Sequence, residues 1–383
     1  MKIDIAKSDL EAALSIAGIA VSTATELSAH YLFRVKDGKV EILTQDIRVF
    51  ARAPLTCTFE GKEEEAFTVE AWRLDKWLSG IPDAVVKLSA DGGGEVHISS
   101  GRSKTKLRSL DPSKFPFWDG LVKGATLVGS LPPAALSKAL HLTRWFTSKD
   151  ENAHPELCQI EAKDGVLWAT NRRALSSVVV PALPTLNIRV SGKDVAALTR
   201  FLTLKQTTEF DVEIKEASRP DADGGGACAL FFRPDGCYLG VTRPGIKFPT
   251  INVDRAAPYD TTLKVNRKEF NSAVAVLSAG APKNHEKVTF NHDRTTGMVS
   301  LSMPCEAGGT DDYSLTLAVV GDSEKFTSFT VDFPYVKGVC DAFDLDDVEF
   351  GINARGESGF TSFKHADEGP TGNQYFGVIV WQT

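Results

Sequence analysis

Three amphipathic segments recur along the chain. In residues 7–21 apolar side chains return every three or four positions, as on one face of a helix, and Ser8 is the expected N-cap. Similar stripes occur in residues 130–148 and 266–279, at intervals of roughly 120 to 140 residues. The recurrence predicts three repeats, each opened by a helix.

Paired strands follow each of these helices. Polar and apolar residues alternate with a period of two, and the dipeptides Asp37-Gly38 and Asp164-Gly165 suit the positive φ of a tight hairpin turn. A third pair turns around residues 293–297. We therefore expect one hairpin behind each helix.

A second helix lies further along each repeat. Residues 70–81, 191–204 and 332–343 have helical periodicity, and further strands follow each of them. The order helix, strands, helix, strands thus occurs three times, which is a repeat architecture.

The first two repeats end alike, with Lys-Phe-Pro at residues 114–116 and 247–249. The chain of 383 residues also exceeds the roughly 250 to 300 that one hydrophobic core organises. We place the three domains at residues 1–123, 124–256 and 257–383.

Two Asp-Gly-Gly-Gly clusters, residues 91–94 and 223–226, occupy equivalent places in the first two repeats. A glycine cluster can cradle a phosphate, but neither copy is followed by Lys-Ser/Thr or opens a helix, as a P-loop must. We interpret both clusters as hairpin loops.

The composition is that of an ordinary soluble protein, with 42% hydrophobic and 24% charged residues. No apolar run approaches the ~20 residues that span a bilayer, and the N-terminus has acidic residues where a signal peptide is apolar. We expect a cytoplasmic protein. The net charge of −7 argues against coating nucleic acid by bulk electrostatics, so any DNA contact needs a local basic face.

Cysteine and histidine spacing favours no metal centre. The six cysteines form no Cys-x-x-Cys pair and several lie in apolar segments, which favours buried free thiols over disulfides or a metal site. His97 and His141 are expected to pack or to face solvent. Paired acids and a nucleophile elbow recur in no repeat, so we expect neither an enzyme nor a cofactor.

Several motifs together resemble one known family. They lie at residues 69–82, 100–116, 167–175, 245–249 and 375–381. In this order and at these spacings they resemble the bacterial DNA polymerase III beta subunit, the sliding clamp, over nearly the whole chain.

The resemblance implies an α+β fold of three clamp domains, each with two helices on antiparallel sheets. Two subunits would close head to tail into a ring around duplex DNA and tether the replicative polymerase, without catalysis. The implied partners are double-stranded DNA, the DNA polymerase III alpha subunit, the clamp loader, other proteins with clamp-binding motifs, and a second copy of the chain. The implied location is the nucleoid, with no membrane contact.

Basic residues on the predicted helices are candidates for the DNA-facing lumen. The pair Arg73 and Lys76 lies three residues apart and the pair Lys193 and Arg200 seven apart, so each pair shares a helical face. Lys193 also matches a family lysine at a helix start. The full set is Arg73, Lys76, Arg144, Lys149, Lys193 and Arg200. The alternative is a solvated helix face.

Two tryptophans on the same predicted helix, Trp72 and Trp77, could stack on bases. At helical spacing, aromatic residues are more often part of the core, and we expect core positions for both.

Charged residues alternate along residues 102–108, with Arg102, Lys104, Lys106 and Arg108 on one face of a strand. This pattern is typical of an edge strand protected from uncontrolled pairing. The resemblance places the strand, with Thr105, at the subunit interface, opposite Val276 and Leu277 of the third domain. The family has an aromatic residue near Thr105, and its absence here favours an alternative: a clamp-like monomer that binds partner peptides without encircling DNA.

The resemblance also implies a hydrophobic cleft for short partner peptides that carry a glutamine and end in leucine or phenylalanine. Its residues here would be Thr170, Arg172, Arg173, Leu175, Pro249, Val253, Gly377, Val378 and Ile379. The family pattern Thr-Asp-Gly-His-Arg-Leu is replaced by Thr-Asn-Arg-Arg-Ala-Leu at residues 170–175. The alternative is that these residues only close an interdomain junction.

Overall fold

A computed structural model describes most of the chain: residues 1–82, 84–116, 118–183, 187–218, 227–243, 246–251, 261–283, 286–296, 298–305, 310–315, 318–321, 328–342, 346–355, 358–366 and 374–382. The chain forms two compact units. Unit 1 comprises Met1–Ala134 and Ile188–Gly245, and unit 2 comprises Ala135–Asn187 and Ile246–Thr383.

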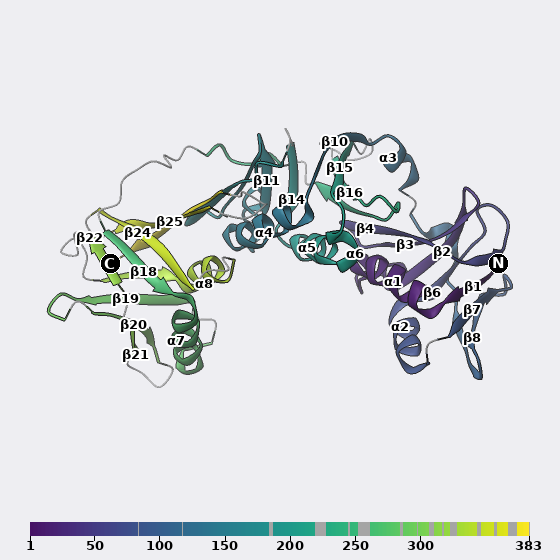
Figure 1. Cartoon of the computed structure of the whole chain (residues 1–383), viewed down its shortest axis with the longest axis horizontal. Coiled ribbons are helices and arrows are strands. Elements are labelled where there is room, and N and C mark those ends of the chain that lie inside the picture. The colour runs from purple at the N-terminus through teal and green to yellow at the C-terminus, as the bar shows by residue number, and fades with distance from the viewer. Residues whose placement is uncertain are drawn as a thin grey trace. The chain divides into compact units, whose positions relative to one another are not determined.

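In the described ranges, six helices lie at the segments that the periodicity predicts, and two short ones, Asp119–Lys123 and Lys205–Thr208, lie outside them (Figure 1). They are α1 (Lys7–Ala17), α2 (Ala71–Gly80), α3 (Asp119–Lys123), α4 (Pro133–Thr143), α5 (Val195–Thr203), α6 (Lys205–Thr208), α7 (Arg267–Gly280) and α8 (Phe333–Ala342). Short 3₁₀ turns are η1 (Gly18–Ala20), η2 (Leu27–Ala29), η3 (Pro112–Lys114), η4 (Arg144–Phe146) and η5 (Pro155–Leu157). No helix in the described ranges is long and apolar enough to cross a membrane.

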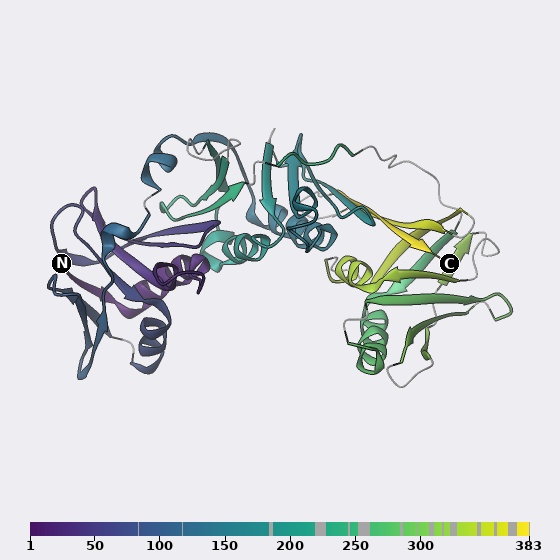
Figure 2. The ribbon, with the colours of Figure 1, turned by 180° about the vertical axis from the view of Figure 1, so that it is seen from behind.

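Unit 1 contains two antiparallel sheets, seen from behind in Figure 2. The first has the order β5 (Thr58–Glu60), β1 (Lys2–Ala6), β7 (Val85–Ala90), β8 (Glu95–Ser100) and β9 (Ser103–Arg108). The second has the order β10 (Thr126–Leu131), β15 (Val212–Ser218), β16 (Ala227–Phe232), β17 (Tyr238–Arg243), β4 (Val49–Leu55), β3 (Lys39–Gln45), β2 (His30–Lys36) and β6 (Ala66–Glu70). Because β17 pairs with β4, strands from the first two predicted repeats share one sheet.

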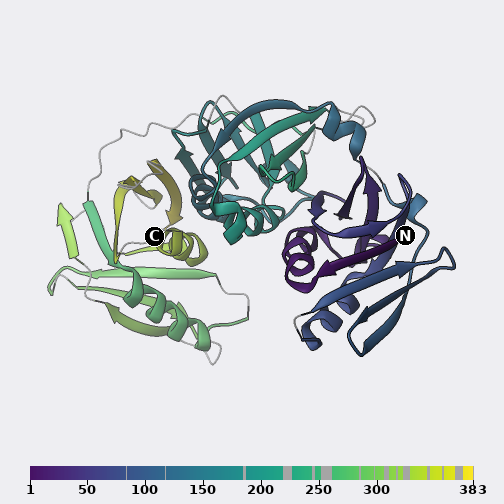
Figure 3. The same cartoon turned by 45° about the vertical axis from the view of Figure 1, so that its right-hand side comes forward.

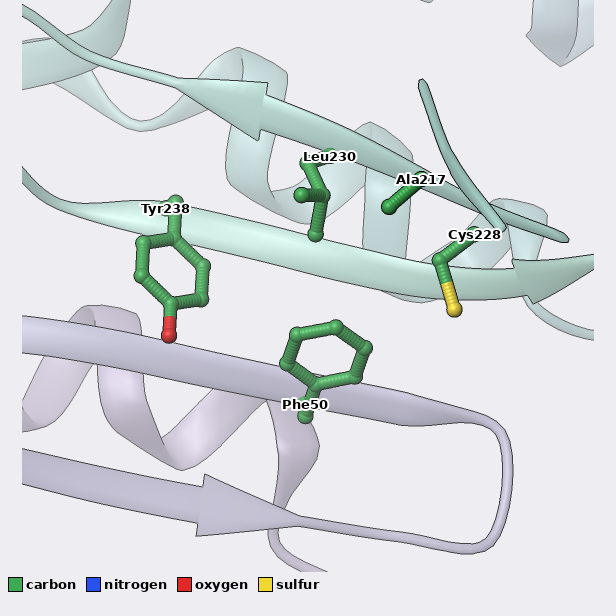
Figure 4. Packing of buried hydrophobic residues seen from close by; sticks show 5 residues of the cluster. All are labelled: Phe50, Ala217, Cys228, Leu230 and Tyr238. Atoms are coloured by element: carbon green, nitrogen blue, oxygen red, sulfur yellow. The ribbon is translucent and has the colours of Figure 1, made fainter. Parts of the chain in front are cut away.

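The junction of β4 and β17 is tightly packed (Figure 4). Phe50 lies among Ala217, Cys228, Leu230 and Tyr238. A Cβ at position 240 would overlap the Phe50 ring, so this position requires glycine. Close packing across the junction therefore depends on both partners, as expected for a well-packed core.

Unit 2 contains a sheet with the order β11 (Gln159–Lys163), β12 (Val166–Thr170), β13 (Ala174–Val179), β26 (Gln374–Gln382), β23 (Ser328–Asp332), β19 (Lys287–Asp293), β20 (Met298–Pro304) and β21 (Thr310–Leu315). Also present are β18 (Thr261–Asn266), β22 (Ala318–Gly321), β24 (Asp347–Arg355) and β25 (Ser358–Ala366), while β14 (Asn187–Ser191) precedes α5. Figure 3 shows α7, in green, beside the green strands β20 and β21 that it contacts. Helices on antiparallel sheets make this an α+β fold, as expected.

The predicted hairpins are confirmed. Asp37 and Asp164 have φ of 49° and 51°, and the glycines after them have φ of 68° and 76°. Residues 91–94 form the loop between β7 and β8, with positive φ at Gly92 and Gly94. The second glycine cluster, 223–226, lies outside the described residues.

The expected N-cap of the first helix is wrong. Ser8 lies inside α1, which begins at Lys7 directly after β1. The Lys7 N–H donates to the carbonyl of Ala84, 3.0 Å away, so a distant backbone group satisfies the helix end in place of a side chain. The first N–H groups of two other helices do the same: Arg267 donates to Asp346 at 2.7 Å and Phe333 to Glu286 at 2.8 Å.

The cysteines are free thiols, as predicted. Cys158, Cys228, Cys237 and Cys340 are buried, whereas Cys57 and Cys305 are partly exposed. Burial raises the pKa of Cys237 to about 12, so this thiol stays protonated and unreactive at neutral pH.

Candidate functional site

Helix α2 presents a basic and aromatic face to solvent. Ala71, Leu74 and Leu78 form its buried stripe, so residues between those positions point outward. Trp72 is 56% exposed, and the expected core position is therefore wrong for this residue. Trp77 is half-buried.

The two predicted lumen residues of α2 surround the Trp72 indole. Arg73 lies over the ring at 5.4 Å and Lys76 at 6.0 Å from its centroid. Arg73 also pairs with Glu70 at 2.9 Å, and the indole N–H donates to the same carboxylate group. Cation–π contacts at exposed sites contribute about 0.5 to 1 kcal/mol each, so they orient the cations without neutralising them.

The second predicted pair is split by a helix boundary. Arg200 is exposed in the last turn of α5, whereas Lys193 is exposed in the turn before that helix begins at Val195. The Lys193 backbone N–H donates to the Ser191 hydroxyl at 3.4 Å. A shared helical face, expected from the spacing, is therefore wrong for this pair.

The remaining lumen candidates lie in unit 2, just beyond α4. Arg144 belongs to η4 and stacks over Trp145 at 5.3 Å from the ring centroid. The Lys149 side chain is 85% exposed and pairs with Glu286 at 3.3 Å. A pair so exposed is weak and leaves the ammonium available to other anions.

Strand β9 is an edge strand of its sheet, as the charge pattern predicts. Lys104, Lys106 and Arg108 are exposed and Leu107 is buried, while Arg102 lies in the turn before the strand. Lys106 faces Glu95 on the neighbouring strand at 3.5 Å. In the described part of unit 1, β8 is the neighbouring strand of β9, and the other edge of β9 is unpaired.

The two apolar residues expected opposite β9 differ in exposure. Val276 is 60% exposed on α7, whereas Leu277 is 2% exposed and belongs to the core of its own unit. Of this pair, Val276 alone has an exposed apolar side chain.

The turn between β12 and β13 is held by its own side chains. Asn171 Oδ1 accepts the N–H groups of Arg173 and Ala174 at 3.0 and 2.8 Å, and the Thr170 hydroxyl donates to the Ala174 carbonyl at 2.9 Å. Arg172 has φ of 74°, a conformation that favours glycine. The turn therefore presents Arg172 and Arg173 to solvent.

Most of the predicted cleft residues lie together. Strand β13 pairs with β26 so that Ala174 faces Ile379, Leu175 faces Val378 and Ser176 faces Gly377. Residues some two hundred positions apart in sequence thus pair directly beside the β12–β13 turn. Pro249 is partly buried in a separate segment, and Val253 lies outside the described residues.

Three further residues support this turn. Asn171 Nδ2 donates to the Tyr335 hydroxyl, and Phe146 stacks on Tyr335 with ring centroids 5.6 Å apart. Glu156 lies 3.7 Å from the Arg172 guanidinium. An asparagine before two arginines could have indicated the side-chain-capped turn, but nothing local in the sequence indicated Tyr335 or Glu156.

Solved structures share this architecture over the whole chain. No protein-family model matches the sequence, and no curated protein matches it. The DNA polymerase III subunit beta from Pseudomonas aeruginosa has a TM-score of 0.75 at 16% identity, over 100% of each chain. The sliding clamp from Bartonella birtlesii, bound to griselimycin, has a TM-score of 0.76 at 19% identity, over 100% of this chain and 99% of that one. The chain has the sliding-clamp fold.

A third solved structure agrees. The DNA polymerase III beta subunit from Thermotoga maritima has a TM-score of 0.76 at 17% identity, over 100% of this chain and 99% of that one. The resemblance inferred from the ordered motifs is thus confirmed at the level of the fold.

Proposed function

We propose that the chain is a DNA sliding clamp: a homodimeric ring of three-domain subunits that encircles duplex DNA in the cytoplasm and tethers a replicative polymerase without catalysing a reaction. The domains would be residues 1–123, 124–256 and 257–383. The observation that carries the proposal is the clamp fold over the full chain length.

The charge distribution supports this function. The chain has a net charge of −7, yet Arg73 and Lys76 lie together on an exposed helix face. A clamp that slides needs weak, sequence-independent attraction to phosphates in its lumen and an acidic surface elsewhere. A local basic face on an acidic protein meets that need.

Topological trapping tests the proposal. The chain is incubated with nicked circular DNA, closed by a chemical crosslinker and washed in high salt. We expect the crosslinked protein to remain on circles and to be released once a restriction enzyme makes the DNA linear. Equal release from circular and linear DNA would contradict ring formation around DNA.

The basic face has its own test. The double variant Arg73→Ala/Lys76→Ala should weaken association with duplex DNA and lower the slope of log affinity against log salt by about 1 to 2, since each phosphate contact contributes about 0.9. The matched control is Lys39→Ala/Lys163→Ala, which removes two exposed lysines on strands. An equal loss in both double variants would mean that the α2 face has no special role.

The β12–β13 turn and β26 are the proposed peptide cleft. A fluorescent peptide with a glutamine and a terminal Leu-Phe should bind the full chain, and Arg173→Ala and Leu175→Ala should each weaken it about fivefold or more. The control is Val85→Ala, which truncates an exposed apolar residue in unit 1. Unchanged binding in both cleft variants would indicate that these residues only close a junction.

A second candidate function, a clamp-like monomer that binds partner peptides without encircling DNA, is favoured by one observation. The burial of Leu277 removes an apolar residue from the expected subunit interface. Sedimentation at micromolar concentration separates the two functions. A monomer that binds the peptide and is not retained on circular DNA would support the second.

A further inference from the structure

A cavity in unit 1 is lined, among the described residues, by none of the proposed peptide cleft or of strand β9. It has a volume of about 420 Å³ and is bounded by α1, the segment after it, β2, α2 and α5. Residues that define its chemistry are Leu14, Gly18, Tyr31, Trp72, Asp75 and Arg200. The size suits a small organic group.

The polar end of the cavity is a carboxylate held by a buried phenol. The Tyr31 hydroxyl donates to Asp75, with distances of 3.2 Å to Oδ1 and 3.0 Å to Oδ2, and the Tyr31 residue is 1% exposed. A Cβ at Gly18 would lie 3.1 Å from the Tyr31 hydroxyl oxygen, so the glycine leaves space for this bond. The carboxylate is thereby fixed in one orientation at the cavity wall.

Asp75 has unused capacity to bind a cation. It makes no ion pair with any residue in the described part of the chain, and it is exposed to solvent. Desolvation raises its pKa above the ordinary value, while Tyr31 and then Arg200 act in the opposite direction. A carboxylate oxygen has several acceptor positions, so an ammonium group can bind beside the Tyr31 hydroxyl.

The rest of the lining is apolar and aromatic. Leu14 and Leu78 are buried with faces on the cavity, and Trp72 contributes a largely exposed indole. The Trp72 ring is anchored through its N–H to Glu70, which adds negative charge beside it. An alkyl chain could pack here while its charged end reaches Asp75.

We propose that this cavity binds a primary alkylammonium group, with the ammonium on Asp75 and the alkyl chain against Trp72 and Leu14. The inference does not depend on the proposed clamp function. Arg200, at the rim, repels the ligand and limits its affinity. The ligand has two possible sources: a free diamine and a lysine side chain of a partner protein.

Calorimetric titration of the full chain tests the proposal with two probes, 1,5-diaminopentane and Nα-acetyl-lysine amide, and with 1-pentanol as the uncharged analogue. We expect binding of at least one amine and much weaker binding of the alcohol. Preference for the diamine identifies a free amine as the ligand class, and preference for the lysine derivative identifies a protein side chain. Equal binding of the alcohol would overturn the proposal.

Four variants locate the site. Asp75→Asn should weaken amine binding ~10-fold or more because it removes a charged hydrogen-bond acceptor, and Trp72→Ala should weaken it about threefold. Arg200→Gln should strengthen binding. Asp9→Asn, at an exposed acid of α1 outside the cavity, should have no effect. If both variants fold and Asp75→Asn changes the affinity for the amine no more than Asp9→Asn does, this site is excluded.

Discussion

Two aspartates of unit 1 have the same side chain and opposite surroundings. Asp119 accepts two hydrogen bonds from the buried Arg34 guanidinium, at 2.7 and 2.9 Å, and Arg34 Nε also donates to the buried Glu41 at 2.8 Å. Asp75 accepts only from the Tyr31 hydroxyl within the described residues. Arg34 lowers the pKa of Asp119, whereas desolvation raises the pKa of Asp75.

The difference separates structural charge from available charge. A carboxylate paired to a guanidinium in fixed geometry ties together segments of the fold, since Arg34 and Asp119 are 85 residues apart. A carboxylate that has only a hydroxyl partner is still able to bind a cation from outside. The same residue type therefore stabilises one region and marks a candidate ligand site in the other.

Removing the guanidinium should have the largest effect. Arg34→Met removes one partner of the Glu41 carboxylate, whose side chain is 2% exposed. Because a buried charge is then left less well paired, the free energy of unfolding should fall by about 3 kcal/mol. Calorimetric unfolding would measure it. The control Lys36→Met removes a more exposed cation, which pairs with Glu64 and lies 3.8 Å from Asp119. It should change the unfolding temperature much less. Equal effects would mean that burial of Arg34 is not what matters.

Removing the phenol hydroxyl should have a smaller effect. Tyr31→Phe keeps the buried ring and deletes the donor to Asp75, which should cost about 2 kcal/mol because a hydrogen bond to a charged group is lost. Urea unfolding is the measurement. A change below about 0.5 kcal/mol would show that the hydroxyl bond adds little to stability.

Titration should separate the two aspartates by sign. The folded pKa of Asp75 is raised, so its ionisation costs stability at neutral pH, and Asp75→Asn should increase Tm at pH 7. That gain should vanish as the pH falls through the folded pKa to below the unfolded value of about 3.8. Asp119→Asn should decrease Tm at pH 7. The folded pKa of Asp119 is lowered, so its ionised form stabilises the fold above the unfolded pKa, and this stabilisation is lost as the pH falls through the folded pKa. Changes of the same sign in both variants would contradict the comparison.

An exposed pair gives the smallest effect. The Arg172 side chain is 66% exposed beside Glu156, so Glu156→Gln should change the free energy of unfolding by less than about 0.5 kcal/mol. Thermal unfolding of this variant measures the change, which should be the smallest of the predicted stability effects. A loss as large as that of Tyr31→Phe would mean that exposure is a poor guide to the strength of these pairs.

Local signals in the sequence predicted local structure well. Asp-Gly pairs predicted the hairpins because positive φ is a property of the turn residues themselves. The charges that alternate along residues 102–108 predicted the edge strand β9, because a strand places every second side chain on one face. The cap at Ser8 was wrong because its function is taken by the Ala84 carbonyl, which no nearby residue reveals. The three domain boundaries and the roles of the predicted site residues stay predictions.

The sequence by itself determined the threefold recurrence of helix and strands, the hairpin turns and the basic face of β9, since each depends on residues close together in the chain. Only the tertiary structure decided that Trp72 is exposed, that Leu277 is buried, and that Tyr31 meets Asp75 across 44 residues. Periodicity shows that a helix has an apolar face, but which residues lie at its edges depends on what packs against it. The candidate amine site consists of residues at the borders of such helix faces, so no sequence motif marks it.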